Sequence, residues 1–550
     1  PGVVSSLYGM CSWELNPEFF CFELSLLFPW LNTPARQLRC VTNLLHACGR
    51  VVGLDVIPHT DRFSEQVLAN PDYFEWLKRV DTQIVEHSSA LVGKVRQCIY
   101  DYLREKGPAI SSECLPVRCE EFFHPQMAEE RRLRMLFGEA QDYGGRMRRR
   151  VELIQRLYRE GYETVPATMA PPFRGLQVDP RPEACVVDER GLVWRDFMIE
   201  RPQSMSRVFN PLARYRFYNS LDENRNWELD FDAPNVPAWD YLCGKIAQMQ
   251  RWFGFDFMRG DMSHVQMRPG GVPEKIDRFY DPLGAVKVYV QEENQAPYFA
   301  YFAESFLAPP GVMAYGDEMD HLEASQADVT LGDLQSSVLG SEAFLRRLTQ
   351  IVDLAAHRRC RPSLTVITAD KDDPRFDSFY LRGNEARLFL ALFLPDFPSY
   401  LSLGFETRDP HPQPAPNEHY TKLYVFHELK GPKATHAPFV WGKNAALFAN
   451  IQRMRACLEQ LWPVLEGQPS RWLLRPAQEP WSKILAWVVE GEHVGWLFVV
   501  NLDVEKCSQE VAIAADVGTL EEMLFSTHLP GARPAQPSSS HTIHLPGLDA

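Results

Sequence analysis

The stretch FDFMRGD, residues 255–261, has the character of a short β-strand that ends on a carboxylate. A second stretch of the same design, YFAYFAE, occupies residues 298–304. The interval between the two acids, about 40 residues, is enough chain for a crossover helix and a second parallel strand. The two stretches therefore predict neighbouring strands of a parallel α/β sheet, each with an acid at its carboxyl end.

The same design recurs along the chain. Strand-like runs end on Asp333, Asp370 and Glu406, and Asp55 lies in a run at 50–57 that we expect to be a buried strand. Amphipathic helices are predicted at 34–49, 342–357 and 384–394. In a parallel α/β barrel the carboxyl ends of the strands converge on one face, so these acids would lie together. The alternative for each acid alone is that it caps the following helix.

Four of these segments resemble the strand-end motifs of the α-amylase superfamily of retaining glycoside hydrolases and transglycosidases, in the family's order. They are DVIPHT at 55–60, MRGD at 258–261, FAES at 302–305 and TADKD at 368–372. The stretch SYLSLGFE at 399–406 is similar to the family's last barrel strand. The resemblance covers roughly residues 5–60 and 225–460.

The resemblance implies an α/β fold: a (β/α)8 TIM barrel with a long excursion after the third strand and a C-terminal antiparallel β-sandwich. On this scheme residues 1–60 form the N-terminal part of the barrel and 61–225 the excursion. Residues 226–464 complete the barrel, and 465–550 form the sandwich, where strands are predicted near 483–502, 510–514 and 541–544. The segment before Asp55 is short for two complete barrel strands, so we expect the first strand to be missing from this chain.

The resemblance also implies catalytic roles. Asp261 would be the nucleophile that forms a covalent glycosyl-enzyme, Glu304 the general acid and then base, and Asp370 a stabiliser of the transition state. Arg259 lies two residues before Asp261 and so on the same side of the strand, where its charge is expected to keep Asp261 ionised. Aromatic side chains at 301–306 are expected to raise the pKa of Glu304 by desolvation.

Five residues are expected to bind substrate: Asp55, His59, Arg259, His264 and Tyr8, the last by stacking on a sugar ring. For Tyr8 and His264 the alternative is an ordinary structural role. Pro58 and Ala369 replace the family's usual Asn and His. Since that Asn supports a structural calcium in the family, calcium is doubtful here, and no other metal or cofactor is predicted.

Composition limits the partners. The 550 residues contain 57 Lys and Arg against 72 Asp and Glu, a net charge of −15, which argues against nucleic acid or an anionic membrane as a partner. No apolar run approaches the length of about 20 residues that a membrane helix requires. The 12 cysteines include no CxxC pair, which favours reduced thiols and a cytoplasmic protein. The oligomeric state stays open. Basic runs at 131–134 and 146–150 are predicted to be solvated helix faces.

The function predicted from these residues is a retaining glycoside hydrolase or transglycosidase that acts on α-glucosidic bonds of an α-glucan or malto-oligosaccharide. Alternatives are a maltosyl- or glucosyl-transferring enzyme with a sugar or phosphate acceptor, and a non-catalytic amylase-like binding protein. A metal-dependent barrel enzyme would require clustered histidines, and His59, His264 and His321 lack a ligand spacing.

Overall fold

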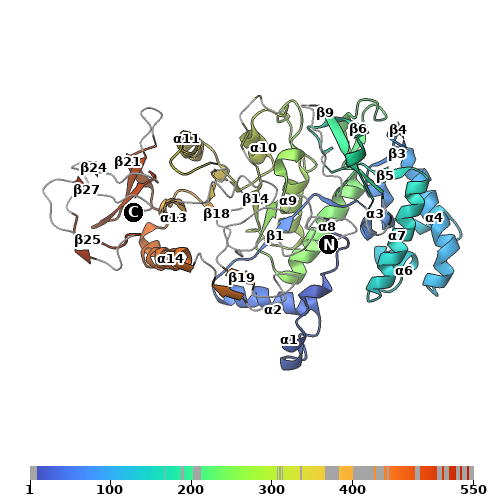
Figure 1. Ribbon diagram of the computed structural model, residues 1–550, viewed down its shortest axis with the longest axis horizontal. Coiled ribbons are helices and arrows are strands. Elements are labelled where there is room, and N and C mark those ends of the chain that lie inside the picture. Colours follow the sequence, from blue (N-terminus) through green and yellow to red (C-terminus); the bar gives the residue numbers. More distant parts are fainter. Residues whose placement is uncertain are drawn as a thin grey trace. The chain divides into compact units, whose positions relative to one another are not determined.

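The computed structural model describes residues 9–62, 64–167, 169–187, 191, 193–201, 212–305, 307–308, 311, 314–332, 334, 337–365, 383–400, 426–428, 439–441, 445–476, 483–503, 511–512, 520–527, 533–534 and 542–543. The chain divides into two compact units, drawn in Figure 1. The first comprises Pro1–Glu304 and Ala308–Ala327, and the second Ser305–Leu307 and Asp328–Ala550.

Three parallel strands of the first unit are paired with one another. They are β1 (Gly53–Val56), β13 (Phe257–Gly260) and β14 (Ala300–Ala303), paired in that order. In the register Asp55 lies opposite Arg259, which lies opposite Phe302. The two strands predicted within residues 255–261 and 298–304 are therefore neighbours. The run at 50–57 is shorter and less buried than predicted, since only Val56 of β1 is fully buried.

Helices α8 (Val236–Phe253) and α9 (Pro282–Glu293) pack against each other and precede β13 and β14. Gly254, at φ 74°, ends α8 in the left-handed conformation that glycine adopts without strain. Asp281 caps α9, because its carboxylate accepts the N–H of Gly284 at 2.6 Å, and Pro282 occupies the first helical position. With α9 between two parallel strands, this segment is a βαβ unit.

The excursion combines helices with small antiparallel sheets. Its helices are α3 (Glu65–Ala69), α4 (Leu91–Ile110), α5 (Cys119–Phe122), α6 (Glu129–Phe137) and α7 (Tyr143–Arg159). Its strands are β3 (Trp76–Val80), β4 (Gln83–Glu86), β5 (Tyr162–Thr164), β6 (Arg174–Val178), β7 (Cys185–Val187), β8 (Val193–Arg195), β9 (Phe197–Arg201), β10 (Leu212–Arg214) and β11 (Tyr218–Ser220). Strands β2 (His59–Asp61) and β12 (Leu229–Pro234) lie at its two ends. The pair β2 and β10 joins the two ends of this long segment.

The prediction that the basic runs of the excursion are solvated holds for Arg131, Arg134 and Arg148, which are exposed, but is wrong for three other arginines. Arg132, Arg146 and Arg150 are buried, and Arg146 forms an ion pair with buried Glu65. Arg132 donates to Met127 O at 2.9 Å. Burial of a guanidinium is favourable only when its charge is paired, and Arg146 has its partner, Glu65, on another helix of the excursion.

The second unit contains two parallel strand pairs, each joined by a helix. In one, β15 (Val329–Thr330) and β16 (Arg361–Pro362) flank α11 (Glu342–His357). In the other, β17 (Leu364–Thr365) and β18 (Ser399–Tyr400) flank α13 (Asn384–Phe393). The predicted helices are confirmed, and Ser341 caps α11 by accepting the N–H of Phe344.

The C-terminal part is antiparallel, as predicted. After α14 (Ala445–Leu465), strands β21 (Ser470–Leu474), β22 (Ile484–Glu490) and β23 (Gly495–Asn501) form one sheet. Short pairs follow: β24 (Val511–Ala512) with β27 (Thr542–Ile543), and β25 (Glu522–Met523) with β26 (Arg533–Pro534). Strands β19 (Phe426–Glu428) and β20 (Phe439–Trp441) pair earlier in the chain. The closed barrel and the sandwich stay predictions.

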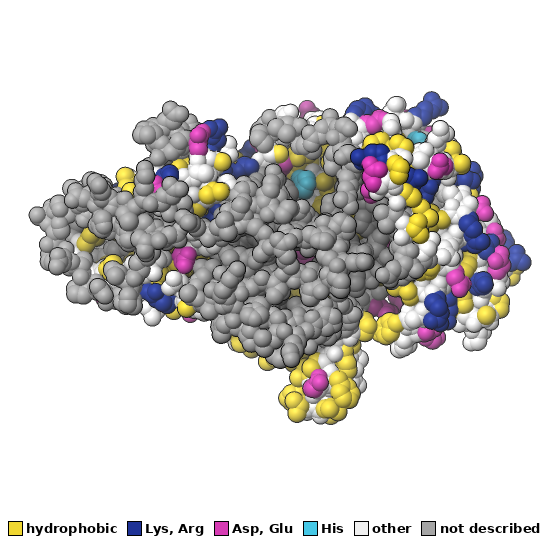
Figure 2. Space-filling model, viewed as in Figure 1, with side chains coloured by type: hydrophobic (Ala, Val, Ile, Leu, Met, Phe, Trp, Pro, Cys, Tyr) yellow, Lys and Arg dark blue, Asp and Glu magenta, His cyan; other side chains and the backbone are white. Residues whose placement is uncertain are grey.

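Helices α1 (Phe22–Leu27) and α2 (Pro34–Ala47) face solvent with apolar side chains. The helix predicted at 34–49 is present, but Leu44 on its apolar stripe is 62% exposed while Gln37 and Thr42 are buried. Gln37 is buried because its amide donates to the carbonyls of Cys21 and Leu31. Figure 2 shows apolar side chains, in yellow, gathered where Figure 1 draws α1. No residue of α1 is buried.

Candidate active site

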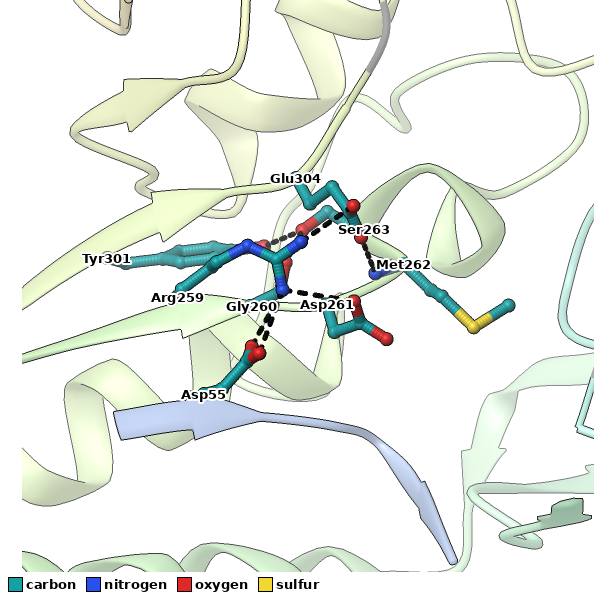
Figure 3. Close-up of polar contacts among 8 residues, drawn as sticks. All are labelled: Asp55, Arg259, Gly260, Asp261, Met262, Ser263, Tyr301 and Glu304. Carbon is teal, nitrogen blue, oxygen red and sulfur yellow. Dashed lines mark hydrogen bonds and ion pairs between the residues drawn. The ribbon is translucent and has the colours of Figure 1, made fainter. Parts of the chain in front are cut away.

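One guanidinium joins three acids from the three neighbouring strand ends (Figure 3). Arg259 Nη1 lies 2.8 and 3.0 Å from the two carboxylate oxygens of Asp55 and 3.1 Å from Asp261 Oδ1. Arg259 Nη2 lies 2.7 Å from Glu304 Oε1. This convergence follows from the register, because Asp55 and Arg259 are direct neighbours and each of the other acids follows its strand by one residue.

Backbone pairing continues one residue past β13 and β14 and fixes the two acids there. The N–H of Asp261 donates to Val56 O at 2.9 Å, and the N–H of Glu304 donates to Gly260 O at 2.9 Å. The chain after Asp261 then turns back onto Glu304: the Met262 N–H donates to Glu304 Oε2 at 3.0 Å and the Ser263 N–H to Glu304 O at 3.1 Å. Both acids are therefore held on a rigid backbone.

A buried hydrogen-bond chain supports this turn. The Tyr301 hydroxyl donates to Ser263 Oγ at 2.9 Å, and Ser263 Oγ donates to Gly260 O at 2.8 Å. Tyr301 is also the reason that residue 260 is glycine. A Cβ at that position would lie 2.6 Å from the Tyr301 ring and 2.8 Å from the Leu283 side chain.

We expect Gly260→Ala to destabilise the protein by about 1–3 kcal/mol through overpacking, because the added methyl group would displace Tyr301 and the turn that it supports. Thermal unfolding measures the loss. A matched change is Gly244→Ala on α8, where the nearest atom to an added Cβ is 3.9 Å away, and it should raise stability slightly, because alanine is favoured over glycine in a helix interior. Equal effects from the two substitutions would contradict this account.

The pKa values of Asp261 and Glu304 are shifted in the opposite directions from those that the sequence predicts. Burial, the neighbouring charge of Glu304 and a hydrogen bond with Glu304 raise the pKa of Asp261 to about 8, although Arg259 opposes the rise. Burial disfavours the charge of Glu304 too, but Arg259, the hydrogen bond with Asp261 and the Met262 N–H together lower its pKa. The predictions that Arg259 keeps Asp261 ionised and that aromatic neighbours raise the pKa of Glu304 are therefore both corrected. Together the two groups hold one proton near neutral pH.

The predicted binding residues lie at different distances from this cluster. Asp55 belongs to it, and burial raises its pKa against the opposing charge of Arg259. His264, in η4 (Ser263–Gln266), is near enough for its charge to lower the pKa of Glu304. His59, on β2, is 2% exposed, and burial lowers its pKa to about 3, so it is neutral. Within the described part of the chain, no contact joins His59 to the acids of this cluster.

Two predicted residues, Asp370 and Tyr8, lie outside the described residues, as do Phe306, Asp333 and Glu406. Within the described part of the chain, no group of three or more His, Cys, Asp or Glu side chains could hold a metal ion. None of the helices described has both the length and the apolar character needed to cross a bilayer. The sequence did not predict the contribution of the Met262 N–H, because a backbone donor leaves no mark in residue type. Tyr301 was expected only as an apolar neighbour.

No family model and no curated protein matches the chain. Among solved structures it is similar to an α-amylase from Geobacillus thermoleovorans in complex with acarbose, at 14% identity and a TM-score of 0.39, over 60% of this chain and 66% of that one. A cyclomaltodextrinase matches at 16% identity and a TM-score of 0.35, over 60% of this chain and 50% of that one. An α-amylase from Malbranchea cinnamomea matches at 11% identity and a TM-score of 0.37, over 62% of this chain and 61% of that one. The chain thus spans about two thirds or less of the length of these proteins.

These identities and TM-scores are low, so the roles of individual residues rest on the geometry of Asp55, Arg259, Asp261 and Glu304.

Proposed function

We propose that the chain is a retaining glycoside hydrolase or transglycosidase of the α-amylase type that acts on α-glucosidic bonds. The observation that carries this proposal is the pair Asp261 and Glu304, whose carboxyl groups stand at adjacent strand ends and contact one guanidinium. Retaining glycosidases need two close carboxyl groups, one charged and one protonated. The motif resemblance supports an α-glucan or malto-oligosaccharide as substrate.

In the proposed reaction Asp261 attacks the anomeric carbon while Glu304 gives its proton to the glycosidic oxygen, so the bond to the leaving sugar breaks. Glu304, now a carboxylate, takes a proton from water or from an acceptor hydroxyl, whose oxygen displaces Asp261. The first step requires the shared proton to be on Glu304. Transfer along the hydrogen bond between the two groups achieves this without changing the charge of the site, and Arg259 contacts the charged member in either state.

Hydrolysis and transfer share the first step and differ only in the acceptor. The deciding experiment follows the anomeric proton signals of the new reducing ends by NMR while the chain cleaves maltoheptaose, with and without added phosphate. We expect the α-anomer to form first. Initial release of the β-anomer would overturn the retaining mechanism, and cleavage equal to that of an Asp261→Asn control would remove glycosidase chemistry altogether. Longer or phosphorylated products would identify a transferase.

The pH dependence of kcat/KM follows from the pair. Activity requires one proton on the two carboxyl groups, so it is lost at low pH, where both are protonated, and at high pH, where both are ionised. Since the pKa of Asp261 is raised to about 8, we expect activity to persist through neutral pH and to fall about tenfold per pH unit above pH 8. The lowered pKa of Glu304 places the other limb below pH 4.5. A profile with its alkaline limb near pH 5 would contradict the shared proton.

A further inference from the structure

The residue after the nucleophile, Met262, has an unusual backbone. Its φ of 54° and ψ of 37° lie in the left-handed region, where a residue with a Cβ is sterically disfavoured. Such a conformation persists only where the surroundings hold it, and it often occurs at functional sites. Glycine would adopt it without this cost, but the chain has methionine here.

The left-handed turn directs the Met262 N–H to the acid. That N–H donates to Glu304 Oε2 at 3.0 Å, and the next N–H, of Ser263, donates to Glu304 O at 3.1 Å. Arg259 binds the other carboxylate oxygen at 2.7 Å. The orientation of the Glu304 carboxyl group is therefore set by one guanidinium from β13 and one backbone donor from the turn.

The side chain of Met262 lies on the other side of the turn. Figure 3 shows its thioether pointing away from Arg259 and Glu304. It packs against a cluster that we name the excursion core: Leu77, Val165, Met169, Ala170, Phe173, Leu176, Val178, Phe197, Ile199, Trp227 and Val265. Except for Val265, which belongs to the same turn as Met262, this core is built from residues 77–227. Burial of an unbranched thioether is favourable and adapts to irregular space.

We infer that Met262 is a positioning residue: the excursion core holds its side chain, and this anchorage keeps the turn left-handed and its N–H on Glu304. The inference rests on the proposed function for its kinetic consequences. It gives the excursion a part in catalysis that does not require the excursion to touch the substrate.

Three substitutions separate positioning from plain packing. Met262→Leu keeps the anchor, so most of the wild-type kcat should remain. Met262→Ala removes the anchor but keeps the cost of the left-handed turn, so kcat should fall by about tenfold or more. Met262→Gly also removes the anchor, but glycine adopts the turn freely, so kcat should exceed that of the alanine variant by about fivefold. If the side chain served only to fill space, glycine would be no better than alanine, and that result overturns the inference.

The matched control is Met135→Ala, which removes the same fully buried side chain from α6 and leaves both the excursion core and the backbone at 262 intact. It should lower the melting temperature as Met262→Ala does, with kcat within about twofold of wild type. The acid limb of kcat/KM should move to higher pH in Met262→Ala and not in Met135→Ala, because loss of the N–H removes one stabiliser of the Glu304 charge. The other groups near Glu304, which are Arg259, Asp261, His264 and, through Arg259, Asp55, are present in both variants.

A second readout keeps this test independent of the proposed function. Difference infrared titration of the full chain, with Glu304→Gln to identify the band, measures the pKa of Glu304 directly. If wild type cleaves no α-glucosidic substrate, the proposed function fails, but the positioning inference still requires this pKa to rise in Met262→Ala and to return toward wild type in Met262→Gly. An unchanged pKa in the alanine variant overturns it.

Discussion

Asp261→Asn should lower kcat for α-glucosidic cleavage by on the order of 10⁴-fold or more, with little change in the melting temperature at pH 5. The amide is close to the carboxyl group in size and cannot form the covalent glycosyl-enzyme, so the first step is lost. At pH 5 the wild-type group already carries a proton, since its pKa is raised to about 8. Single-turnover kinetics with maltoheptaose measure the loss. Activity within tenfold of wild type would show that another group is the nucleophile.

The matched variant is Glu304→Gln, which keeps the nucleophile and removes the acid. On maltoheptaose it should lose about as much activity as Asp261→Asn. On α-maltosyl fluoride, whose leaving group needs no proton, it should form the glycosyl-enzyme at a rate much closer to that of wild type, while Asp261→Asn stays inactive. If both variants responded equally to the fluoride, the assignment of the two roles would be wrong.

Asp261→Asn should also change the way in which stability depends on pH. The folded-state pKa of Asp261 lies above its unfolded value of 3.8, so its contribution is fully present below about pH 4 and is lost as the pH rises through 8. The melting temperature of wild type should therefore fall between pH 5 and pH 9, and Asp261→Asn should reduce that fall. A steeper fall in the variant would contradict the direction of the shift.

Arg259→Met should destabilise the fold by about 3–5 kcal/mol, the largest stability loss that we expect from one substitution in the site. The side chains of Asp261 and Glu304 are only 9% and 16% exposed, and Arg259 is the cation that binds both. Without it the site holds a buried negative charge that solvent cannot screen well. Chemical denaturation of the full chain measures the loss.

A double variant separates charge from packing. Arg259→Met combined with Asp261→Asn removes the cation and one of its partners, so it should be less destabilised than the sum of the two single variants. Arg259→Lys should recover only part of the loss, because an ammonium group has one nitrogen atom and cannot contact three carboxylates as the two terminal nitrogens of a guanidinium do. Strict additivity in the double variant would show that Arg259 stabilises the fold through its aliphatic stem alone.

The sequence predicts those parts of the fold that local periodicity decides. Helices α11 and α13 begin at the predicted residues because their apolar positions recur at helical spacing, and the strand before Asp261 and that before Glu304 were recognised from their apolar runs. Parallel pairing of these strands then brings the two acids together, as predicted.

What the sequence did not predict depends on partners far along the chain. Arg146 in a basic run reads as solvated, but Glu65 neutralises it inside the excursion. The proton of the acid pair is another case: residue types suggest that Arg259 ionises Asp261, while the structure brings Arg259 within 2.7 Å of Glu304 as well. Which acid is charged is thus decided by distances between strands, and no local pattern encodes them.

The apolar side chains on α1 and α2 have a consequence for work with the purified protein. Phe22, Leu27 and Leu44 are each more than 60% exposed, and with their neighbours they present apolar area on the order of several hundred Å², as much as the largest patches on ordinary monomers. Ammonium sulfate should therefore salt the chain out at unusually low concentration. Since the attraction between such surfaces weakens on cooling, dilute and cold preparations should stay clear where warm, concentrated ones turn turbid.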